Sequence, residues 1–279
     1  LCFTSPDGTE RRIFLHRTDR IILAGSVELT ASAIKLIMRH KIDTVFVSKN
    51  GRFNGKLEFQ EGKNVFLRKR QYELLGNNNK IVPLVRSIVE GKLRNQLAFM
   101  QRISRKREDN TLAKAIAAMQ KTIAAVRESD NIDSIRGHEG YGARLYFSVL
   151  RKNIDPEWAQ FSGRTMHPPK DNVNALLSFL YTLLLYRVDA LVEMEGLDPY
   201  VGYLHALNYG KRALTFDLME EYRSNICDTV ACALFNLGIL KEEHFETKEF
   251  RVQDEEMPLD PDALPASELE STETTERQT

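Results

Sequence analysis

The spacing of apolar residues divides the chain into a strand-like part and a helix-like part. Up to about residue 75, short runs rich in Ile, Val, Phe and Leu alternate with glycines, which predicts β-strands. The runs fall at residues 12–16, 20–24, 44–48 and 65–67. One amphipathic helix is predicted among them at residues 29–40, where apolar side chains recur at helical spacing.

From residue 80 to about residue 241 the pattern is helical. Apolar residues recur every three to four positions from Val85 onward, which is typical of a helix with one buried face. Pro83 is expected near the start of that helix, where its missing N–H costs little. Further helices are predicted at residues 113–126, 174–191 and 217–237, the first of them rich in alanine.

These patterns predict an α+β protein with two domains. A small N-terminal β-rich domain is expected over residues 1–76, and a larger all-helical catalytic domain over residues 80–252. Residues 77–79 are a run of asparagines after a glycine, which indicates a linker. Residues 253–279 are acidic and rich in Pro, Ser and Thr, so this tail is predicted to be disordered.

Composition narrows the class of protein. The chain has 279 residues, of which 42% are hydrophobic and 28% are charged, as in ordinary globular proteins. Its three cysteines are too few for a disulfide framework and favour a reducing compartment, the cytoplasm. The longest apolar stretch, residues 175–186, falls short of the roughly 20 residues that a membrane span needs, so no membrane association is expected.

The net charge of zero conceals a strong asymmetry. The segment 254–279 carries nine acidic residues and one arginine, so the rest of the chain has an excess of positive charge. Within that rest, residues 63–107 hold twelve Lys or Arg against two Glu. Such a basic stretch indicates a polyanionic partner, most often nucleic acid, although a solvated helix surface is the alternative.

A carboxylate pair among apolar residues is the first candidate for chemistry. Asp217 and Glu220 are three residues apart and therefore share a helix face. Two buried carboxylates repel each other, and a divalent cation relieves the repulsion. With His205 as an imidazole ligand, the donor set suits Mg²⁺ or Mn²⁺. Alternatively, Asp217 caps a helix, Glu220 forms an ion pair with a nearby arginine, and His205 is a core histidine.

Glu139 is the second candidate. It lies in IRGHEGYGARLYF, where three glycines surround it and let backbones approach closely. Tight helix packing explains the same glycines equally well. Other chemistries find little support, because the segment GRFNGK at residues 51–56 departs from a phosphate-binding loop and no GxSxG nucleophile motif occurs.

Taken together, several segments resemble the Cas1 family, the CRISPR-associated integrases of spacer acquisition. The resemblance covers roughly residues 10–245 and follows the family's order and spacing. It rests on the segments KIVPLVRSIVEGKLRNQ, IRGHEGYGARLYF, GRTMHPPKDNVNALLSFLYTLLL, GLDPYVGYLH and ALTFDLMEEYR.

The resemblance implies a small β domain and a larger helical domain, as the pattern predicts. It also implies a homodimer built largely through the β domains, and a larger assembly with a Cas2 protein that inserts captured DNA fragments into a CRISPR repeat array. Some members are fused to a Cas4-like nuclease, so such a nuclease, fused or separate, is a candidate partner.

The resemblance further implies a metal site that holds Mg²⁺ or Mn²⁺. The family's ligands carry over to Glu139, His205 and Glu220, which we expect on three separate helices. Asp217 matches the family's second acidic residue on the last of these helices and is assigned to the catalytic group. The implied reaction is attack by the 3′-hydroxyl of the captured DNA on a phosphodiester at the repeat boundary.

Basic residues are expected to bind the DNA. Lys211 and Arg212 lie between His205 and Asp217 and are predicted to contact the reacting strand, with ion pairs to nearby carboxylates as the alternative. The remaining candidates come from the basic stretch and would contact phosphates: Arg68, Lys69, Arg70, Arg102, Arg105, Lys106 and Arg107. Two other functions remain open at this point, a transposon-type integrase of the same catalytic family and a non-catalytic DNA-binding assembly subunit.

Overall fold

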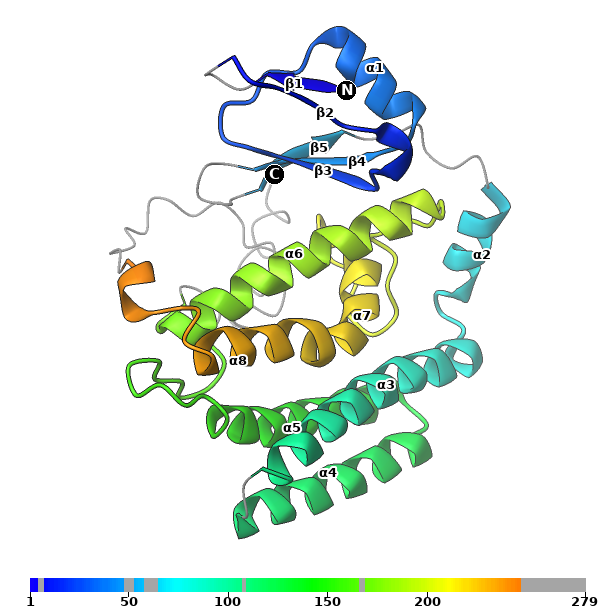
Figure 1. Cartoon of the computed structure of the whole chain (residues 1–279). Coiled ribbons are helices and arrows are strands. Elements are labelled where there is room, and N and C mark those ends of the chain that lie inside the picture. The colour runs from blue at the N-terminus through cyan, green and yellow to red at the C-terminus, as the bar shows by residue number, and fades with distance from the viewer. Residues whose placement is uncertain (5–7, 48–52, 58–64, 107–108, 166–168, 247–279) are drawn as a thin grey trace, which may run out of the picture. The chain divides into compact units, whose positions relative to one another are not determined.

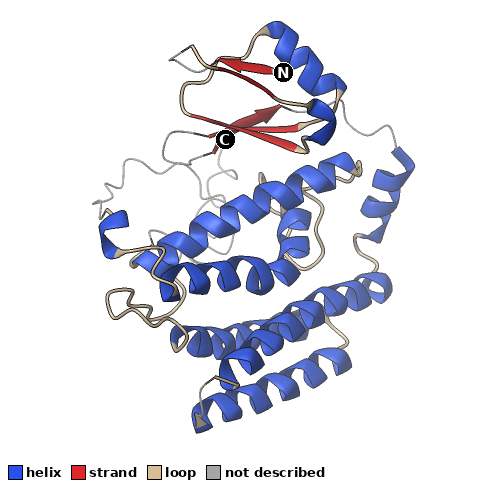
Figure 2. Cartoon of the chain, in the orientation of Figure 1, coloured by secondary structure: helices blue, strands red, loops and turns tan. Residues whose placement is uncertain are grey.

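A computed structural model of the chain divides it into two compact units, residues 1–63 and 64–279 (Figure 1). The structure describes residues 1–4, 8–47, 53–57, 65–106, 109–165 and 169–246. The tail predicted to be disordered, 253–279, lies outside these residues. The described part combines a small strand-containing unit with a larger helical one, as the α+β prediction requires (Figure 2).

The N-terminal unit contains two small sheets. Strands β1 (Cys2–Thr4) and β2 (Glu10–Arg12) form an antiparallel pair. The second sheet has the order β3–β4–β5, formed by β3 (Arg20–Ala24), β4 (Asp43–Val47) and β5 (Phe53–Leu57). Helix α1 (Ala31–Arg39) connects the parallel strands β3 and β4, and Thr30 caps its N-terminus.

The predicted elements of this unit are correct where the apolar runs are long. The strands predicted at 20–24 and 44–48 are β3 and β4, and the helix predicted at 29–40 is α1. The strand prediction at 12–16 was wrong for most of its length, because β2 ends at Arg12 and residues 15–17 form a short 3₁₀ helix, η1 (Leu15–Arg17).

The C-terminal unit is built from helices. Its helices are α2 (Val65–Leu74), α3 (Asn78–Ser104), α4 (Asn110–Glu128), α5 (Ile132–Arg151), α6 (Asn172–Met194), α7 (Ala213–Tyr222) and α8 (Thr229–Asn236), with a π-helix, η2 (Arg223–Asp228), between the last two and a 3₁₀ turn, η3 (Glu242–His244), after them. Helices α3, α4 and α5 pack on one another, and α7 packs against both α3 and α6. Long, strongly periodic segments were thus predicted correctly as helices.

Helix α2 belongs to the helical unit. The strand prediction at 65–67 was wrong, because these residues begin α2 and Phe66 is exposed. Gln71 of α2 is buried and donates to the backbone oxygens of Asp198 and Val201 at 2.7 and 3.1 Å. The division between the units therefore falls after residue 63. Residues 77–79, predicted as the linker, lie within the helical unit, where Asn77 is the N-cap of α3 and residues 78–79 begin that helix.

Helix α6 is a core helix of this unit. Among the described residues, it is the one helix long and apolar enough to cross a membrane by length and composition. Val173, Leu177 and Leu185 of α6 are buried in the main apolar cluster, which also includes Met219 of α7. Because its apolar side chains contribute to this core, the folded unit itself accounts for the composition of α6.

Candidate functional site

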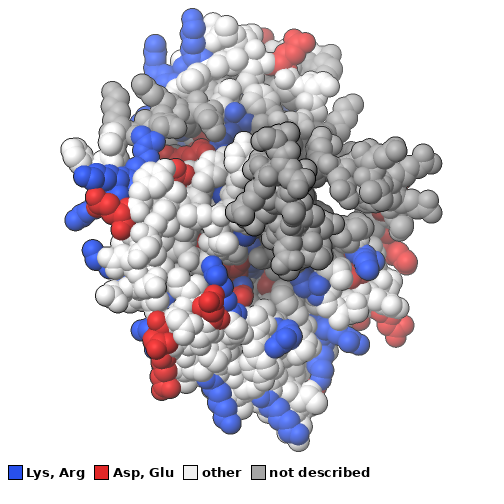
Figure 3. All heavy atoms as spheres, turned by 180° about the vertical axis from the view of Figure 1, so that it is seen from behind, with Lys and Arg blue, Asp and Glu red and all other residues white. Residues whose placement is uncertain are grey.

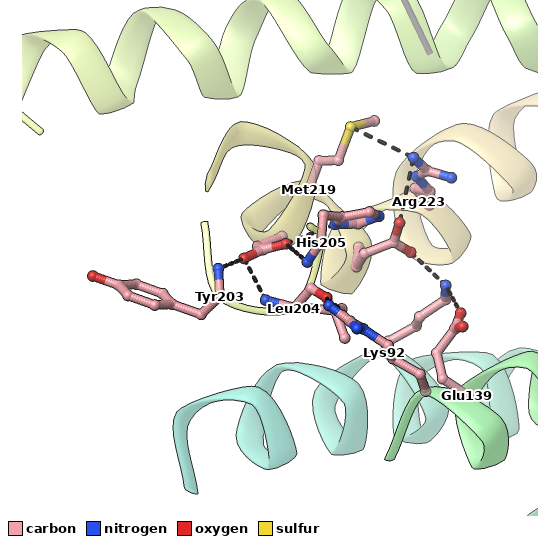
Figure 4. A network of polar contacts seen from close by, with 10 residues as sticks. Lys92, Glu139, Tyr203, Leu204, His205, Met219 and Arg223 are labelled. Atoms are coloured by element: carbon pink, nitrogen blue, oxygen red, sulfur yellow. Dashed lines mark hydrogen bonds and ion pairs between the residues drawn. The ribbon is translucent and has the colours of Figure 1, made fainter. Parts of the chain in front are cut away.

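Asp217 organises the loop that precedes α7. Its fully buried carboxylate accepts hydrogen bonds from the backbone N–H groups of Tyr203, Leu204 and His205, at 2.5, 2.9 and 3.0 Å (Figure 4). The same carboxylate lies 2.6 Å from Nδ1 of His205. Asp217 therefore fixes both the backbone of residues 203–205 and the orientation of the imidazole ring.

Two further contacts hold this loop close to its neighbours. A Cβ atom on Gly202 would lie 2.5 Å from the backbone carbon of Ala213, so the close approach of the loop to α7 requires glycine here. Arg136 of α5 donates from Nε to the backbone oxygen of Leu204 at 2.8 Å. The loop is thus fastened to α5 as well as to α7.

Lys92 of α3 lies between two carboxylates. Its Nζ is 2.6 Å from Oε2 of Glu220 on α7 and also forms an ion pair with Glu139 on α5 (Figure 4). Glu220 receives a second cation, Arg223, whose Nη2 is 3.3 Å from Oε1. Burial alone would lower the pKa of Lys92, but the charges of Glu220 and Glu139 outweigh it and hold that pKa above its ordinary value.

The three predicted metal ligands share one pocket. Glu139, His205 and Glu220 line a cavity of about 380 Å³. They come from α5, from the loop before α7 and from α7, so the expectation of three helices was wrong for His205. Asp217 lies behind His205, outside the pocket wall. The other lining residues are Lys92, Arg136, Ala143, Phe147, Arg164, Tyr181, Leu204, Ala206 and Arg223.

The donor chemistry of this pocket fits a hard divalent cation. Glu139 and Glu220 contact the same ammonium nitrogen, so their carboxylates face one point. Carboxylate oxygens are ligands that Mg²⁺ and Mn²⁺ prefer. A ligating imidazole almost always donates its other N–H to a carboxylate, a backbone carbonyl or water, and Nδ1 of His205 has such a partner in Asp217. Among the described residues, no three His, Cys, Asp or Glu side chains stand in a coordinating arrangement. Lys92 lies where the two carboxylates meet.

A buried polar cluster adjoins the pocket. Asp228, the last residue of the π-helix, accepts hydrogen bonds from Tyr146 and Tyr181 at 2.6 and 2.7 Å. Burial raises the pKa of Asp228 to about 6, although both hydroxyl donors oppose the shift. Arg164 and Arg223 stack on the Tyr181 ring, which itself lines the pocket. The extra residue per turn in a π-helix is often found beside functional sites.

The predicted DNA-binding residues differ in their surroundings. Arg212 forms ion pairs with Asp189 and Glu193 at 2.6 and 2.9 Å, which is the alternative role considered for it. Lys211 is half-buried, and its backbone N–H donates to Asn208. Arg102 stacks on Phe99 near the C-terminal end of α3.

The remaining candidates lie on α2 and at the end of α3. Arg68, Lys69 and Arg70 belong to α2, where Lys69 pairs with Glu73 at 3.7 Å. Arg105 and Lys106 follow α3 and are exposed, and Arg107 lies outside the described residues. Figure 3, which views the molecule from behind relative to Figure 1, shows Lys and Arg side chains spread over the lower part of the helical unit.

Sequence reasoning missed Lys92, Arg136 and Tyr181. Lys92 was counted only as one of the twelve basic residues of the stretch. The helical spacing of Val85, Val89, Lys92 and Gln96 was a signal in the sequence, because it places Lys92 on the same helix face as two valines. The structure buries all four residues. A lysine on such a buried stripe needs an anionic partner.

The model of the family "CRISPR associated protein Cas1" matches residues 1–256. The chain belongs to the Cas1 family. Among curated relatives, the "CRISPR-associated endonuclease Cas1 1" of Moorella thermoacetica is 37% identical over 240 residues, which is 84% of this chain and 70% of the relative. This confirms the resemblance and places the chain among Cas1 proteins named as endonucleases.

Solved structures agree with the Cas1 assignment. A Cas1 protein from Thermotoga maritima has a TM-score of 0.74 at 26% identity, covering 89% of this chain and 77% of that one. The partial Cas6-RT-Cas1–Cas2 complex has a TM-score of 0.66 at 28% identity, covering 89% of this chain and 74% of that one. A casposase bound to integration product has a TM-score of 0.70 at 24% identity, covering 83% of this chain and 64% of that one. This likeness shows the fold alone.

Proposed function

We propose that this Cas1-family chain is a metal-dependent DNA integrase that inserts captured DNA fragments into a CRISPR repeat array. The observation that carries the proposal is the shared pocket of Glu139, His205 and Glu220, with Asp217 orienting the imidazole from behind. The reaction is a phosphodiester transesterification, in which the 3′-hydroxyl of the captured DNA attacks a phosphodiester of the array. The bond to the leaving 3′-oxygen of the repeat strand breaks as the new bond forms.

The pocket residues and Asp217 behind them have different roles in this proposal. Glu139, His205 and Glu220 would hold Mg²⁺ or Mn²⁺, which when bound lowers the pKa of the attacking hydroxyl and neutralises charge developing on the phosphate. Asp217 keeps Nδ1 of His205 engaged, so that the other ring nitrogen is the one available for ligation. Arg164 and Arg223 bring positive charge to the pocket wall, where a phosphate would lie.

The proposed partners are inferred from membership of the Cas1 family. The Cas6-RT-Cas1–Cas2 complex pairs a Cas1 chain with Cas2, and we propose the same kind of partner here. We further propose a homodimer through the N-terminal unit and DNA as both substrate and target. A Cas4-like nuclease remains a candidate partner. A transposon-type integrase is less well supported, because the matching family model and the Moorella thermoacetica relative are both CRISPR-associated.

The proposal is tested by joining a labelled DNA fragment to a plasmid that carries a repeat array, with the Cas2 partner present. We expect a joined product with Mg²⁺ or Mn²⁺ and a free 3′-hydroxyl, and none with a chelator or a 3′-deoxy end, because the hydroxyl is the nucleophile. Joining at random plasmid sites would favour the transposon-type function. The complete lack of joined product would favour the non-catalytic assembly subunit.

DNA capture is expected to depend on the basic side chains after α3. Reversing Arg105 and Lys106 to Glu should weaken binding to unrelated DNA sequences to a similar extent. It should also make the plot of log affinity against log salt concentration less steep by about two, because each phosphate contact on duplex DNA contributes about −0.9 to that slope. A gel-shift titration at several salt concentrations measures both effects. The matched control reverses Lys35 and Arg39, an exposed pair on α1. If the Arg105 and Lys106 reversal leaves affinity and slope unchanged, these residues form a solvated surface.

A further inference from the structure

Lys92 is held in a cluster whose charges balance. Its ammonium group and the Arg223 guanidinium face the carboxylates of Glu139 and Glu220, and the Lys92 side chain is only 11% exposed. Two carboxylates this close would repel each other strongly without a cation between them. The Lys92 ammonium therefore does in this structure what a metal ion would do, because it neutralises both carboxylates at one point.

The ammonium group and a divalent cation cannot occupy this point together. A cation ligated by Glu139 and Glu220 would lie within a few ångströms of the Lys92 nitrogen, and like charges at that distance repel strongly inside a protein. Lysine has a flexible four-carbon stem, so its head group can leave while its backbone stays. The backbone of α3 is held in place here, because α3 packs against both α5 and α7.

We propose that Lys92 is a built-in counter-ion of the Glu139–Glu220 pair. It keeps the two ligands together in the metal-free protein, and its side chain moves out from between them when the divalent cation binds. This inference rests on the proposed function, since it takes Glu139 and Glu220 as the metal ligands. It makes Lys92 a positioning residue that sets how tightly the pocket binds its metal.

The direct test measures Mn²⁺ binding by calorimetry to the full chain and its variants. Lys92→Met keeps a long apolar side chain but removes the charge, so it should bind Mn²⁺ about tenfold more tightly or better, because a repulsive unit charge at this range is worth at least that factor. Mn²⁺ should also raise the melting temperature of Lys92→Met more than that of the unaltered chain. Lys114→Met, at an exposed position on α4, is the matched control and should change neither. An affinity of Lys92→Met equal to or weaker than that of the unaltered chain overturns the proposal.

A second measurement uses the unaltered chain, in case Lys92→Met folds poorly. Acetic anhydride labelling, read by peptide mass spectrometry, reports how accessible each lysine is. We expect Lys92 to be protected without metal and labelled severalfold faster at saturating Mn²⁺, with Lys114 as the internal reference. Continued protection of Lys92 at saturating Mn²⁺ overturns the proposal.

Glu220→Gln separates this inference from the proposed function. If Glu220→Gln loses Mn²⁺ binding while Lys92→Met fails to gain it, the metal site stands and only the role of Lys92 is wrong. If Glu220→Gln binds Mn²⁺ like the unaltered chain, the ligand assignment is wrong and the inference fails with it.

Discussion

Replacing His205 with alanine is expected to abolish strand transfer while leaving DNA capture nearly intact. His205 lines the same pocket as Glu139 and Glu220, and its ring is oriented by Asp217. Loss of an outer-shell partner of a metal ligand typically costs roughly 10- to 100-fold in activity, so loss of the ligand itself should cost more. Capture depends on phosphate contacts from Lys and Arg, and His205→Ala removes none of them.

The two activities are measured side by side. The joining assay with Mn²⁺ and Cas2 reports strand transfer, and a gel shift of the same fragment reports capture. His138→Ala is the control, because His138 precedes Glu139 but lines a separate groove with Lys114 and Lys121. Strand transfer at the unaltered rate would show that His205 is no ligand. Loss of both activities together with a lowered melting temperature would show that it is a core histidine.

Replacing Asp217 with alanine is expected to destabilise the helical unit and to abolish strand transfer as well. The change removes the acceptor for three backbone N–H groups and for the His205 ring. A buried donor without an acceptor costs about 1–3 kcal/mol, so the summed loss should be at least about 3 kcal/mol. In a domain of this size that corresponds to a fall in melting temperature of roughly 6–12 °C.

Thermal unfolding of the full chain checks this expectation. Asp133→Ala is the matched control, because this aspartate of α5 has a side chain that is 94% exposed and should change little. Asp217→Asn keeps the side-chain volume but places an amide N–H₂ group, itself a donor, among the backbone N–H donors of residues 203–205. It should therefore also lose strand transfer. An Asp217→Ala variant that unfolds at the unaltered temperature would contradict the role assigned to this carboxylate.

The helical unit was largely predictable because its periodic segments are long. Helix α6 and the alanine-rich α4 were each predicted within three residues of their bounds. The short strands were less predictable. Strand β5 reads FNGKL, in which polar residues and a glycine hide the strand signal, and its pairing with β4 is what makes it a strand.

The three candidate ligands could be named from the sequence, but the residues around them could not. The resemblance pointed to Glu139, His205 and Glu220, but only the packing of α3 against α5 and α7 brings Lys92 between two of them. A helix through 217–237 was expected as continuous, whereas the structure inserts a π-helix from Arg223 to Asp228. Its last residue, Asp228, accepts hydrogen bonds from Tyr146 on α5 and Tyr181 on α6, partners that lie far from it in the sequence.

The loop between His205 and α7 offers a place to attach a probe. Its two ends are fixed, by the Asp217 hydrogen bonds at residues 203–205 and by the ion pairs of Arg212 at the other end. Between them the Tyr209 side chain is fully exposed at the tip of a turn that Asn208 closes. A fluorophore at position 209 would therefore report on events a few residues from the pocket without altering the groups that build it.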